Sequence, residues 1–269
     1  MPSYVITGAS RGIGFEFLRQ LSADNANLVV GLVRDKPTTE AKVAKELPGR
    51  NIHIIEGDIT DYDGLKKAVA EVAKLTDGVD YLIANAAVVS PWSAYDGIGD
   101  LAQSPKELEK DLVESFKVNV VGNIHLFSLF LPLVMKGNAK KVITITSGMA
   151  DIEFISTYDI APAAPYSISK AGMNAAVAKF SAQYKKDGIL FIGISPGMVD
   201  TGHYGNATEE QLAEAVKMVQ KFSTYAPFFN GPITPEESVS AILDVITHAD
   251  IKKGHAGAFV SHYGNKQWL

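Results

Sequence analysis

The segment YSISK contains two side chains that can act on a proton, Tyr166 and Lys170. Residues at positions i and i+4 share one face of a helix, so the Lys170 ammonium can lie beside the phenolic oxygen of Tyr166. A neighbouring positive charge favours the phenolate, so Lys170 should lower the pKa of Tyr166 from its ordinary value of about 10. Tyr166 would then donate a proton when a ketone is reduced and accept one when an alcohol is oxidised. The alternative is a tyrosine packed on the core beside a lysine whose charged end reaches solvent.

Ser147 ends the apolar run KKVITITS, 19 residues before Tyr166. At the carboxyl end of a strand, its hydroxyl would donate a hydrogen bond to the substrate oxygen beside the tyrosine, as a small oxyanion hole does. Thr146 is the neighbouring alternative, but side chains alternate along a strand, which points Thr146 elsewhere. We therefore predict Ser147, Tyr166 and Lys170 as catalytic residues.

A glycine-rich turn, TGASRGIG, follows the first apolar run and opens a helical segment. Gly8 permits a tight turn, Gly12 lets backbone approach a pyrophosphate, and Gly14 allows the helix to pack closely on the strand. The amino end of the helix attracts phosphate groups. A plain strand-to-helix turn is the alternative, and its place in the first strand–helix–strand unit favours the nucleotide. The predicted cofactor residues of this turn are Gly8, Ser10, Arg11, Gly12, Ile13 and Gly14.

The end of the second apolar run, GLVRDK, indicates which nucleotide binds. An acidic residue there would hold a ribose 2′-hydroxyl, but Val33 occupies that position and Arg34 follows it. Arg34 and Arg11 would hold a 2′-phosphate by charge-assisted hydrogen bonds. In the alternative, both arginines are solvated and Asp35 binds the ribose. We predict NADP(H) in preference to NAD(H).

Two further runs end in residues that suit a dinucleotide. After the third run, Asp58 and Ile59 would meet the adenine; a helix N-cap, which Thr60 or Asp61 would serve equally well, is the alternative. After the fourth run, small side chains would let the cofactor lie against backbone, at Asn85, Ala86 and Ala87.

Short β-branched runs alternate with longer helix-period segments along the chain. The predicted strands span residues 4–7, 27–33, 51–57, 79–85, 140–147, 189–196 and 257–262. The predicted helices between them span residues 12–23, 38–47, 62–75, 105–135, 164–186 and 235–248. Continuous apolar strands separated by helices indicate a parallel sheet covered on both faces. With no repeat or linker, we predict one doubly wound Rossmann-type domain over residues 1–269, with seven parallel strands.

Composition and charge exclude several classes of protein. The net charge of -5, without a long run of Lys or Arg, argues against nucleic-acid or anionic-membrane partners. The chain has no Cys, which excludes disulfides, thiolate metal sites and cysteine nucleophiles, and we assign no metal site. Polar residues and Pro132 interrupt the longest apolar region, so a buried helix is expected there rather than a membrane span. The first strand starts almost at Met1, leaving no room for a leader, so we expect a cytoplasmic protein.

The order of these motifs resembles the short-chain dehydrogenase/reductase family, in particular its carbonyl reductases. The matching positions are Thr7–Gly8, Gly12–Gly14, Asn85–Ala86, Asn119, Ser147, Tyr166 with Lys170, and Pro196–Gly197. They span almost the whole chain, and several spaced motifs are more specific than any one of them. The resemblance implies an NADPH-dependent carbonyl reductase acting on a small-molecule ketone or alcohol. The alternatives are a dinucleotide-sensing regulatory protein that does not catalyse, and an epimerase or dehydratase acting on a nucleotide-sugar.

The resemblance also implies roles for individual residues. Asn119 would be the fourth catalytic residue, which holds a helix kink and a water that links the lysine to solvent. Its alternative is a polar residue that satisfies a helix carbonyl. Tyr166 and Lys170 would also bind the cofactor, with Lys170 holding the nicotinamide ribose. Pro196–Gly197 would lie beside the nicotinamide, where Val199 backbone and the Thr201 hydroxyl bond the carboxamide. A purely structural turn is the alternative there.

The chain departs from the family pattern at two places. Ala84 and Ala87 replace an Asn and a Gly that are common in the family, which weakens that motif without removing Asn85. The spacing from Ser147 to Tyr166 is longer than the family norm, and we interpret the surplus as an enlarged substrate loop.

Three segments interrupt the strand and helix rhythm, each after the carboxyl end of a strand: 88–104, 148–163 and 197–232. Ligands bind at that edge of open α/β sheets. In the family the last segment is a lid over the substrate, and its aromatic residues suit an apolar or aromatic ketone. Within this segment, ATEEQLAEAVKMVQKF is predicted to form an amphipathic helix that starts near Thr208; core packing of an ordinary helix is the alternative to a lid. The predicted substrate contacts are Phe154, Tyr158, His203, Tyr204, Phe222 and Tyr225.

Biological context follows from the resemblance alone. The sequence looks like reductases of fungal or bacterial secondary metabolism, some of which act on aromatic polyketide ketones. Family members are commonly homodimers or homotetramers, and the segment FKVNVVGNIHLFSLF would supply an interface. The same segment would serve equally well as intramolecular core.

Overall fold

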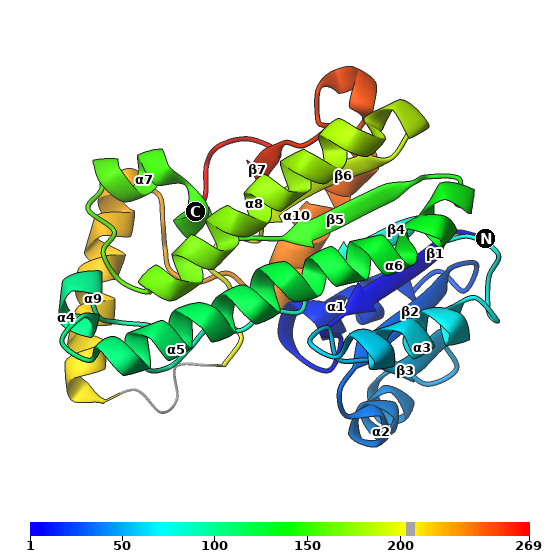
Figure 1. The fold of residues 1–269 in the computed structure, drawn as a ribbon, viewed down its shortest axis with the longest axis horizontal. Coiled ribbons are helices and arrows are strands. Elements are labelled where there is room, and N and C mark those ends of the chain that lie inside the picture. Colours follow the sequence, from blue (N-terminus) through cyan, green and yellow to red (C-terminus); the bar gives the residue numbers. More distant parts are fainter. Residues whose placement is uncertain (203–207) are drawn as a thin grey trace.

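The seven apolar runs form one parallel sheet in the computed structural model, which describes residues 1–202 and 208–269. The strand order is β3-β2-β1-β4-β5-β6-β7, so the chain changes direction across the sheet between β1 and β4 (Figure 1). The strands are β1 (Ser3–Thr7), β2 (Leu28–Val33), β3 (Ile52–Glu56), β4 (Tyr81–Ala84), β5 (Lys141–Ile145), β6 (Leu190–Ser195) and β7 (Phe259–Ser261). The predicted doubly wound, seven-stranded parallel sheet is confirmed.

Helices cover both faces of this sheet, because each strand buries side chains on both sides. In β2, Val30 and Leu32 belong to one core and Val29 and Val33 to the other. The first core packs against α3 (Tyr62–Val72), α6 (Asn123–Lys136) and α8 (Ala164–Tyr184). The second core packs against α1 (Gly12–Leu21), α2 (Lys36–Glu46) and α10 (Pro235–His248). Two buried faces explain why the strands are continuously apolar.

The predicted helix over 105–135 is interrupted in its middle. α5 (Pro105–Phe116) passes into a π-helical stretch, Lys117–Gly122, before α6 begins. By length and composition Pro105–Lys136 is apolar enough to cross a bilayer, but half of its most apolar window is buried. Its residues Leu126, Phe127 and Phe130 lie in the core on the sheet. Like the core helix of a globular protein, this helix therefore packs inside the fold.

The three irregular segments contain helices of their own. The structure shows α4 (Ile98–Leu101) within the first segment and α7 (Ile152–Thr157) within the second. The third contains α9 (Glu209–Tyr225), in agreement with the helix expected from near Thr208. In Figure 1, α4, α7 and α9 lie together at one end of the molecule, beyond the carboxyl ends of the strands.

Asp80 joins the first and second halves of the sheet at the opposite edge. It is 5% exposed, and its carboxylate accepts hydrogen bonds from Ser3 N and Oγ at 2.9 and 3.1 Å. It also accepts from Asn138 N at 2.6 Å and Ala139 N at 3.1 Å. Burial alone would raise the pKa of Asp80, but these hydrogen bonds outweigh it and hold the pKa below its ordinary value.

We expect Asp80→Asn to lower the free energy of unfolding at pH 7 by about 2 kcal/mol, because the amide presents N–H groups to backbone N–H donors. The lowered pKa of Asp80 means that its contribution is present above pH 4 and is lost as pH falls through the folded-state pKa. The difference in free energy of unfolding between wild type and Asp80→Asn should therefore become smaller below pH 4. Urea unfolding followed by circular dichroism measures it, with exposed Asp77→Asn as the control. Equal stability of the two variants at pH 7 would contradict the assignment.

Candidate active site

A cleft of about 1480 Å³ opens at the carboxyl edge of the sheet, between the glycine-rich turn and the three irregular segments. It is lined by all the predicted cofactor residues: Gly8, Ser10, Arg11, Gly12, Ile13, Gly14, Arg34, Asp58, Ile59, Asn85, Ala86, Ala87, Tyr166, Lys170, Pro196, Gly197, Val199 and Thr201. Ser147 lines it as well. Residues from seven parts of the chain thus meet at one surface, because the carboxyl ends of parallel strands share an edge.

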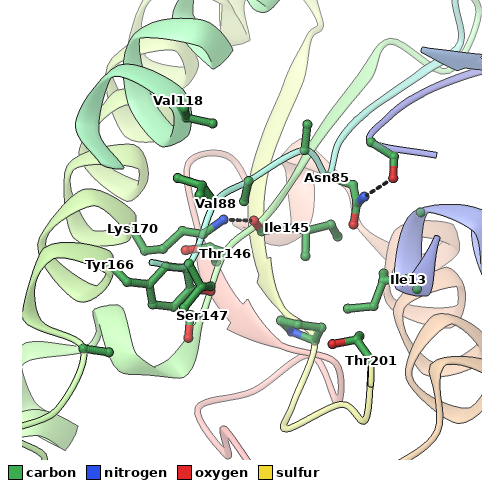
Figure 2. Close-up of a pocket in the computed structure, with 18 of the residues that line it drawn as sticks. Ile13, Asn85, Val88, Val118, Ile145, Thr146, Ser147, Tyr166, Lys170 and Thr201 are labelled. Atoms are coloured by element: carbon green, nitrogen blue, oxygen red, sulfur yellow. Dashed lines mark hydrogen bonds between the residues drawn. The ribbon is translucent and has the colours of Figure 1, made fainter. Parts of the chain in front are cut away.

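Helix α8 carries Tyr166 and Lys170 across the end of β5. In Figure 2 both side chains extend from the helix toward Ser147 and Ile145. Lys170 Nζ donates a hydrogen bond of 2.8 Å to the Ile145 carbonyl and lies 5.7 Å from the centre of the Tyr166 ring. Lys170 is 3% exposed, and burial lowers its pKa from 10.5 to about 8. At neutral pH a largely protonated ammonium therefore lies beside the phenol.

Ser147 stands at the start of the enlarged loop, directly after β5. Its Oγ accepts a hydrogen bond of 3.2 Å from Met149 N, which leaves the hydroxyl proton as a donor toward a ligand. The next residue is held in position by the end of β6, because Gly148 N donates a hydrogen bond of 2.8 Å to Ser195 Oγ. Thr146, the alternative to Ser147, is buried, and its methyl lies against Gly193 of β6.

Asn119 lies behind the cleft, in the π-helical stretch, and is fully buried. Its side chain makes both backbone hydrogen bonds to Val88, accepting from N at 2.8 Å and donating to O at 3.0 Å. It also donates to Ser169 Oγ at 2.9 Å. The Asn119 carbonyl is satisfied by Asn123 Nδ2 at 2.9 Å. The interruption of the helix thus directs Asn119 to the loop after β4 and to α8.

Sequence reasoning assigned no role to Ser169, Val88 or Thr7. Ser169 Oγ donates to the Tyr166 carbonyl at 2.7 Å and so connects Asn119 with the helix turn between the tyrosine and the lysine. Thr7 Oγ1 accepts from Asn85 N and Ala86 N, both at 3.0 Å, and holds the ends of β1 and β4 together. Ser169 lies inside YSISK and Thr7 begins TGASRGIG, but neither position in a motif identifies a hydrogen-bond partner.

The glycine-rich turn has the form that a pyrophosphate requires. Gly8 and Gly12 have φ of +67° and +54°, and a side chain on Gly8 would meet Ala86 Cα at 2.9 Å. The N-cap residue of α1, Arg11, makes no side-chain cap, and the first turn holds no acidic residue. Within the described residues, the N–H groups at this helix end therefore lack a side-chain cap. Backbone donors and an uncompensated positive dipole suit the phosphates of a dinucleotide.

The region near the end of β2 separates the two candidates for the ribose site. Asp35 caps α2, where its carboxylate accepts from Thr38 N at 3.1 Å, and hydrogen bonds from Thr38 lower its pKa. Arg34 and Arg11 are exposed at the cleft, and neither forms an ion pair with the described residues. Two guanidinium groups are therefore available there to bind a 2′-phosphate.

At the adenine side, the N-cap question has a definite answer. Asp61 caps α3, accepting from Gly64 N at 3.1 Å. Asp58 instead accepts from Thr60 N and Thr60 Oγ1, both at 2.8 Å, and lines the cleft together with Ile59.

The predicted substrate residues divide into three groups. Phe154 and Phe222 line the cleft. Tyr158 and Tyr225 are not among the cleft-lining residues, and they pack behind Phe154 with ring centroids 5.6 and 4.7 Å from it. His203 and Tyr204 lie outside the described residues. We name the packed set of Phe154, Tyr158, Ile160, Phe222, Tyr225, Phe229 and Trp268 the aromatic cluster.

Two cleft-lining residues after the last strand, Trp268 and Leu269, carried no sequence signal at all. Trp268 is 3% exposed and stacks on Phe259 at 4.4 Å. They are found only from the fold, because nothing in the sequence places the segment after β7 beside Ser147.

Comparison with known proteins shows similarity along almost the whole chain. The sequence model of a family described as short chain dehydrogenase matches residues 3–212. The short chain dehydrogenase virK of Hypocrea virens is 60% identical over 271 residues, with 100% of both chains covered. The short-chain dehydrogenase/reductase iacC of Pestalotiopsis fici is 53% identical over 272 residues, also with 100% of both covered. The solved NADPH-bound carbonyl reductase from chicken fatty liver aligns over 98% of each chain, with a TM-score of 0.76 and 25% identity.

We expect Lys170→Met to raise the free energy of unfolding at pH 7. Lowering the pKa from 10.5 to about 8 corresponds to a desolvation penalty of roughly 3 kcal/mol, against which the lost hydrogen bond counts about 1 kcal/mol. Between pH 8 and pH 10.5 the Lys170 side chain is protonated in the unfolded chain and neutral in the folded protein. The free energy of unfolding of the wild type therefore rises with pH over this range, and its difference from that of Lys170→Met becomes smaller.

Urea unfolding at pH 7, 8.5 and 10 measures this effect. Lys179→Met, at an exposed position of the same helix, is the matched control. A difference between wild type and Lys170→Met that does not change with pH would show that Lys170 is not a buried, titrating ammonium.

Proposed function

The chain belongs to the short-chain dehydrogenase family, and on that premise we propose that it is an NADP(H)-dependent oxidoreductase that interconverts a ketone and a secondary alcohol. The observation that carries the proposal is the buried Lys170 ammonium beside Tyr166, with Ser147 on the same cleft. A protein that only binds the dinucleotide does not require the complete set of Ser147, Tyr166, Lys170 and Asn119, which combines a proton donor with a hydrogen-bond donor for a substrate oxygen. The charge of the buried Lys170 is useful where a proton moves.

The three side chains divide the work at the substrate oxygen. A bound nicotinamide dinucleotide supplies the hydride. Ser147 donates a hydrogen bond to the ketone oxygen, and Tyr166 transfers its phenolic proton to the same oxygen as negative charge develops there. The Lys170 ammonium stabilises the phenolate that remains. In the oxidative direction the phenolate accepts the alcohol proton.

Asn119 acts by positioning other residues of the site and not by contact with the substrate. It holds the backbone of Val88, which lines the cleft, and through Ser169 it holds the turn of α8 between Tyr166 and Lys170. A small error in the placement of a proton donor has a large effect on rate.

The preference for NADP(H) is supported by the charges near the end of β2. Arg34 and Arg11 face the cleft, whereas the Asp35 carboxylate is engaged in capping α2. The chicken carbonyl reductase that aligns with this chain is described as NADPH-bound.

The substrate proposed is an apolar or aromatic ketone. Side chains from the irregular segments that line the cleft near Ser147 are mostly apolar, among them Met149, Phe154, Met218 and Phe222. An uncompensated charge on the substrate would be poorly solvated there. We place the reaction in secondary metabolism on the same ground, since aromatic ketones are common there.

We further propose a cytoplasmic homo-oligomer. Apolar side chains on the adjoining helices α5 and α8 are exposed, namely Val113, Phe116 and Ile168. Burying them against a second copy would stabilise the pair.

Tyr166→Phe is expected to lower ketone-dependent NADPH oxidation by about 10²- to 10⁴-fold, because it removes the proton that is transferred to the ketone oxygen. The test is a panel of ketones with NADPH, followed at the nicotinamide absorbance, together with NADPH affinity measured by fluorescence. Tyr263→Phe, at an exposed tyrosine, is the control. Turnover at the wild-type rate with NADPH still bound would refute the mechanism.

Arg34→Asp is expected to lower the ratio of kcat/KM for NADPH over NADH by about 10- to 100-fold, since it replaces a charge-assisted hydrogen bond to the 2′-phosphate with repulsion. Lys36→Asp makes the same charge change two residues away, outside this cleft, and should leave the ratio nearly constant. Equal ratios in both variants would remove Arg34 from the 2′-phosphate site.

A further inference from the structure

The segment after the last strand, residues 265–269, reaches back to the cleft, and we name it the tail. Trp268 and Leu269 line the cleft, and Trp268 is almost fully buried. Figure 1 shows the end of the chain near α7 and the beginning of α8. The tail therefore belongs to the substrate side of the cleft, opposite the glycine-rich turn.

Trp268 packs directly against the residue that follows Ser147. A Cβ added to Gly148 would lie 2.5 Å from Trp268 Cβ and 2.8 Å from its Cγ. The absence of a side chain at Gly148 therefore makes room for the tryptophan. Because Gly148 is bonded to Ser147, the indole occupies the space next to the group that would hold the ketone oxygen.

The phenol of Tyr225 joins the tail to α9 by hydrogen bonds. Tyr225, in the last turn of α9, donates to the Lys266 carbonyl at 2.8 Å and accepts from Trp268 N at 2.9 Å. Two hydrogen bonds to backbone on either side of residue 267 hold that short segment in one conformation. The tail also forms an ion pair at the start of α7, where Lys266 lies 3.6 Å from the N-cap residue Asp151; the Lys266 side chain is exposed and that of Asp151 is mostly buried.

The surrounding aromatic side chains complete a continuous wall. Trp268 stacks on Phe259 with the ring planes 15° apart. Phe154 of α7 and Phe222 of α9 line the same cleft, with ring centroids 6.1 Å apart. The enlarged loop, α9 and the tail thus share one apolar surface, although they are far apart in the sequence.

We propose that Trp268 and Leu269 determine which carbon skeletons of the substrate the site accepts, and that Tyr225 is the positioning residue that holds them. The inference rests on the proposed function, because the cleft is taken as the ketone site. The ligand class is a neutral carbocyclic ketone, whose rings lie against the apolar side chains of Trp268, Leu269, Phe154 and Phe222 while its oxygen faces Ser147 and Tyr166. The indole limits the size of the carbon skeleton that fits.

The test compares a bicyclic ketone, 2-tetralone, with a monocyclic one, cyclohexanone. Their dissociation constants are measured by calorimetry in the presence of NADP⁺, which needs no turnover, and their kcat/KM values are measured with NADPH. The variants are Trp268→Ala, which shortens the wall, and Tyr225→Phe, which keeps the ring and removes both hydrogen bonds to the tail. Tyr158→Phe is the matched control: it lies in the same cluster, 5.0 Å from Tyr225, and its hydroxyl forms no hydrogen bond with the described residues.

We expect Trp268→Ala to shift the affinity ratio toward 2-tetralone by about fivefold or more, the size of effect that about one methylene group has in an apolar pocket. Tyr225→Phe should shift it in the same direction by a smaller factor, and Tyr158→Phe should leave it unchanged. NADPH affinity should be the same in all four proteins, which separates a local change from a loss of folding.

The outcomes distinguish this inference from the proposed function. A shifted affinity ratio without NADPH oxidation by any ketone would overturn the reductase and keep the tail as the wall of a ligand site. NADPH oxidation with the affinity ratio unchanged in Trp268→Ala and Tyr225→Phe would overturn the role of the tail. Wild-type protein that binds neither ketone would overturn it as well.

Discussion

The Lys170 ammonium is buried where it donates to the last carbonyl of β5, and the other parts of the catalytic side are arranged around that charge. A buried charge is unfavourable unless it is held and used, so its helix has to be fixed against the sheet. Ser169 and Asn119 do this from behind, by hydrogen bonds that end on the backbone of Val88. The π-helical stretch follows from the same constraint, since it directs Asn119 out of the regular helix ladder. Burial of the Lys170 charge lowers the stability of the fold at a position where the proposed proton transfer requires that charge.

The two halves of the cleft are built in different ways. The cofactor half is made of strand ends and tight turns, in which backbone atoms are held by the sheet itself; Thr7 Oγ1 between β1 and β4 is an example. The substrate half is made of three irregular segments that have no sheet to hold them. The second and third segments are held by packing in the aromatic cluster, and the Tyr225 hydroxyl joins the third segment to the tail. The first segment is held at Val88 by Asn119 and at Gly97 by an isolated bridge to Pro162. Such a wall can be changed in sequence without disturbing the dinucleotide site, which is how one fold accommodates different substrates.

Several side chains have roles that their types did not reveal. Tyr225 was expected to touch substrate, yet its hydroxyl bonds the backbone of the tail. Capping α3 was the alternative role of Asp58, and Thr60 or Asp61 would have served it equally well; Asp61 is the cap. Asp35 was the alternative ribose ligand, but it caps α2. In each case the residue type suits both roles, and the partner that decides between them is chosen by the backbone path.

The sequence by itself determined the sheet, the order of its elements and the residues at the strand ends. Those features depend on local periodicity, on glycines with positive φ and on the rule that parallel strands place their carboxyl ends at one edge. Only the tertiary structure decided what lies behind and opposite them: the bond from Asn119 to Ser169, the packing of Trp268 on Gly148 and the tie from Tyr225 to the tail. These contacts join residues 43 to 120 positions apart. No local pattern records such pairs, because their geometry exists only once the intervening chain has packed.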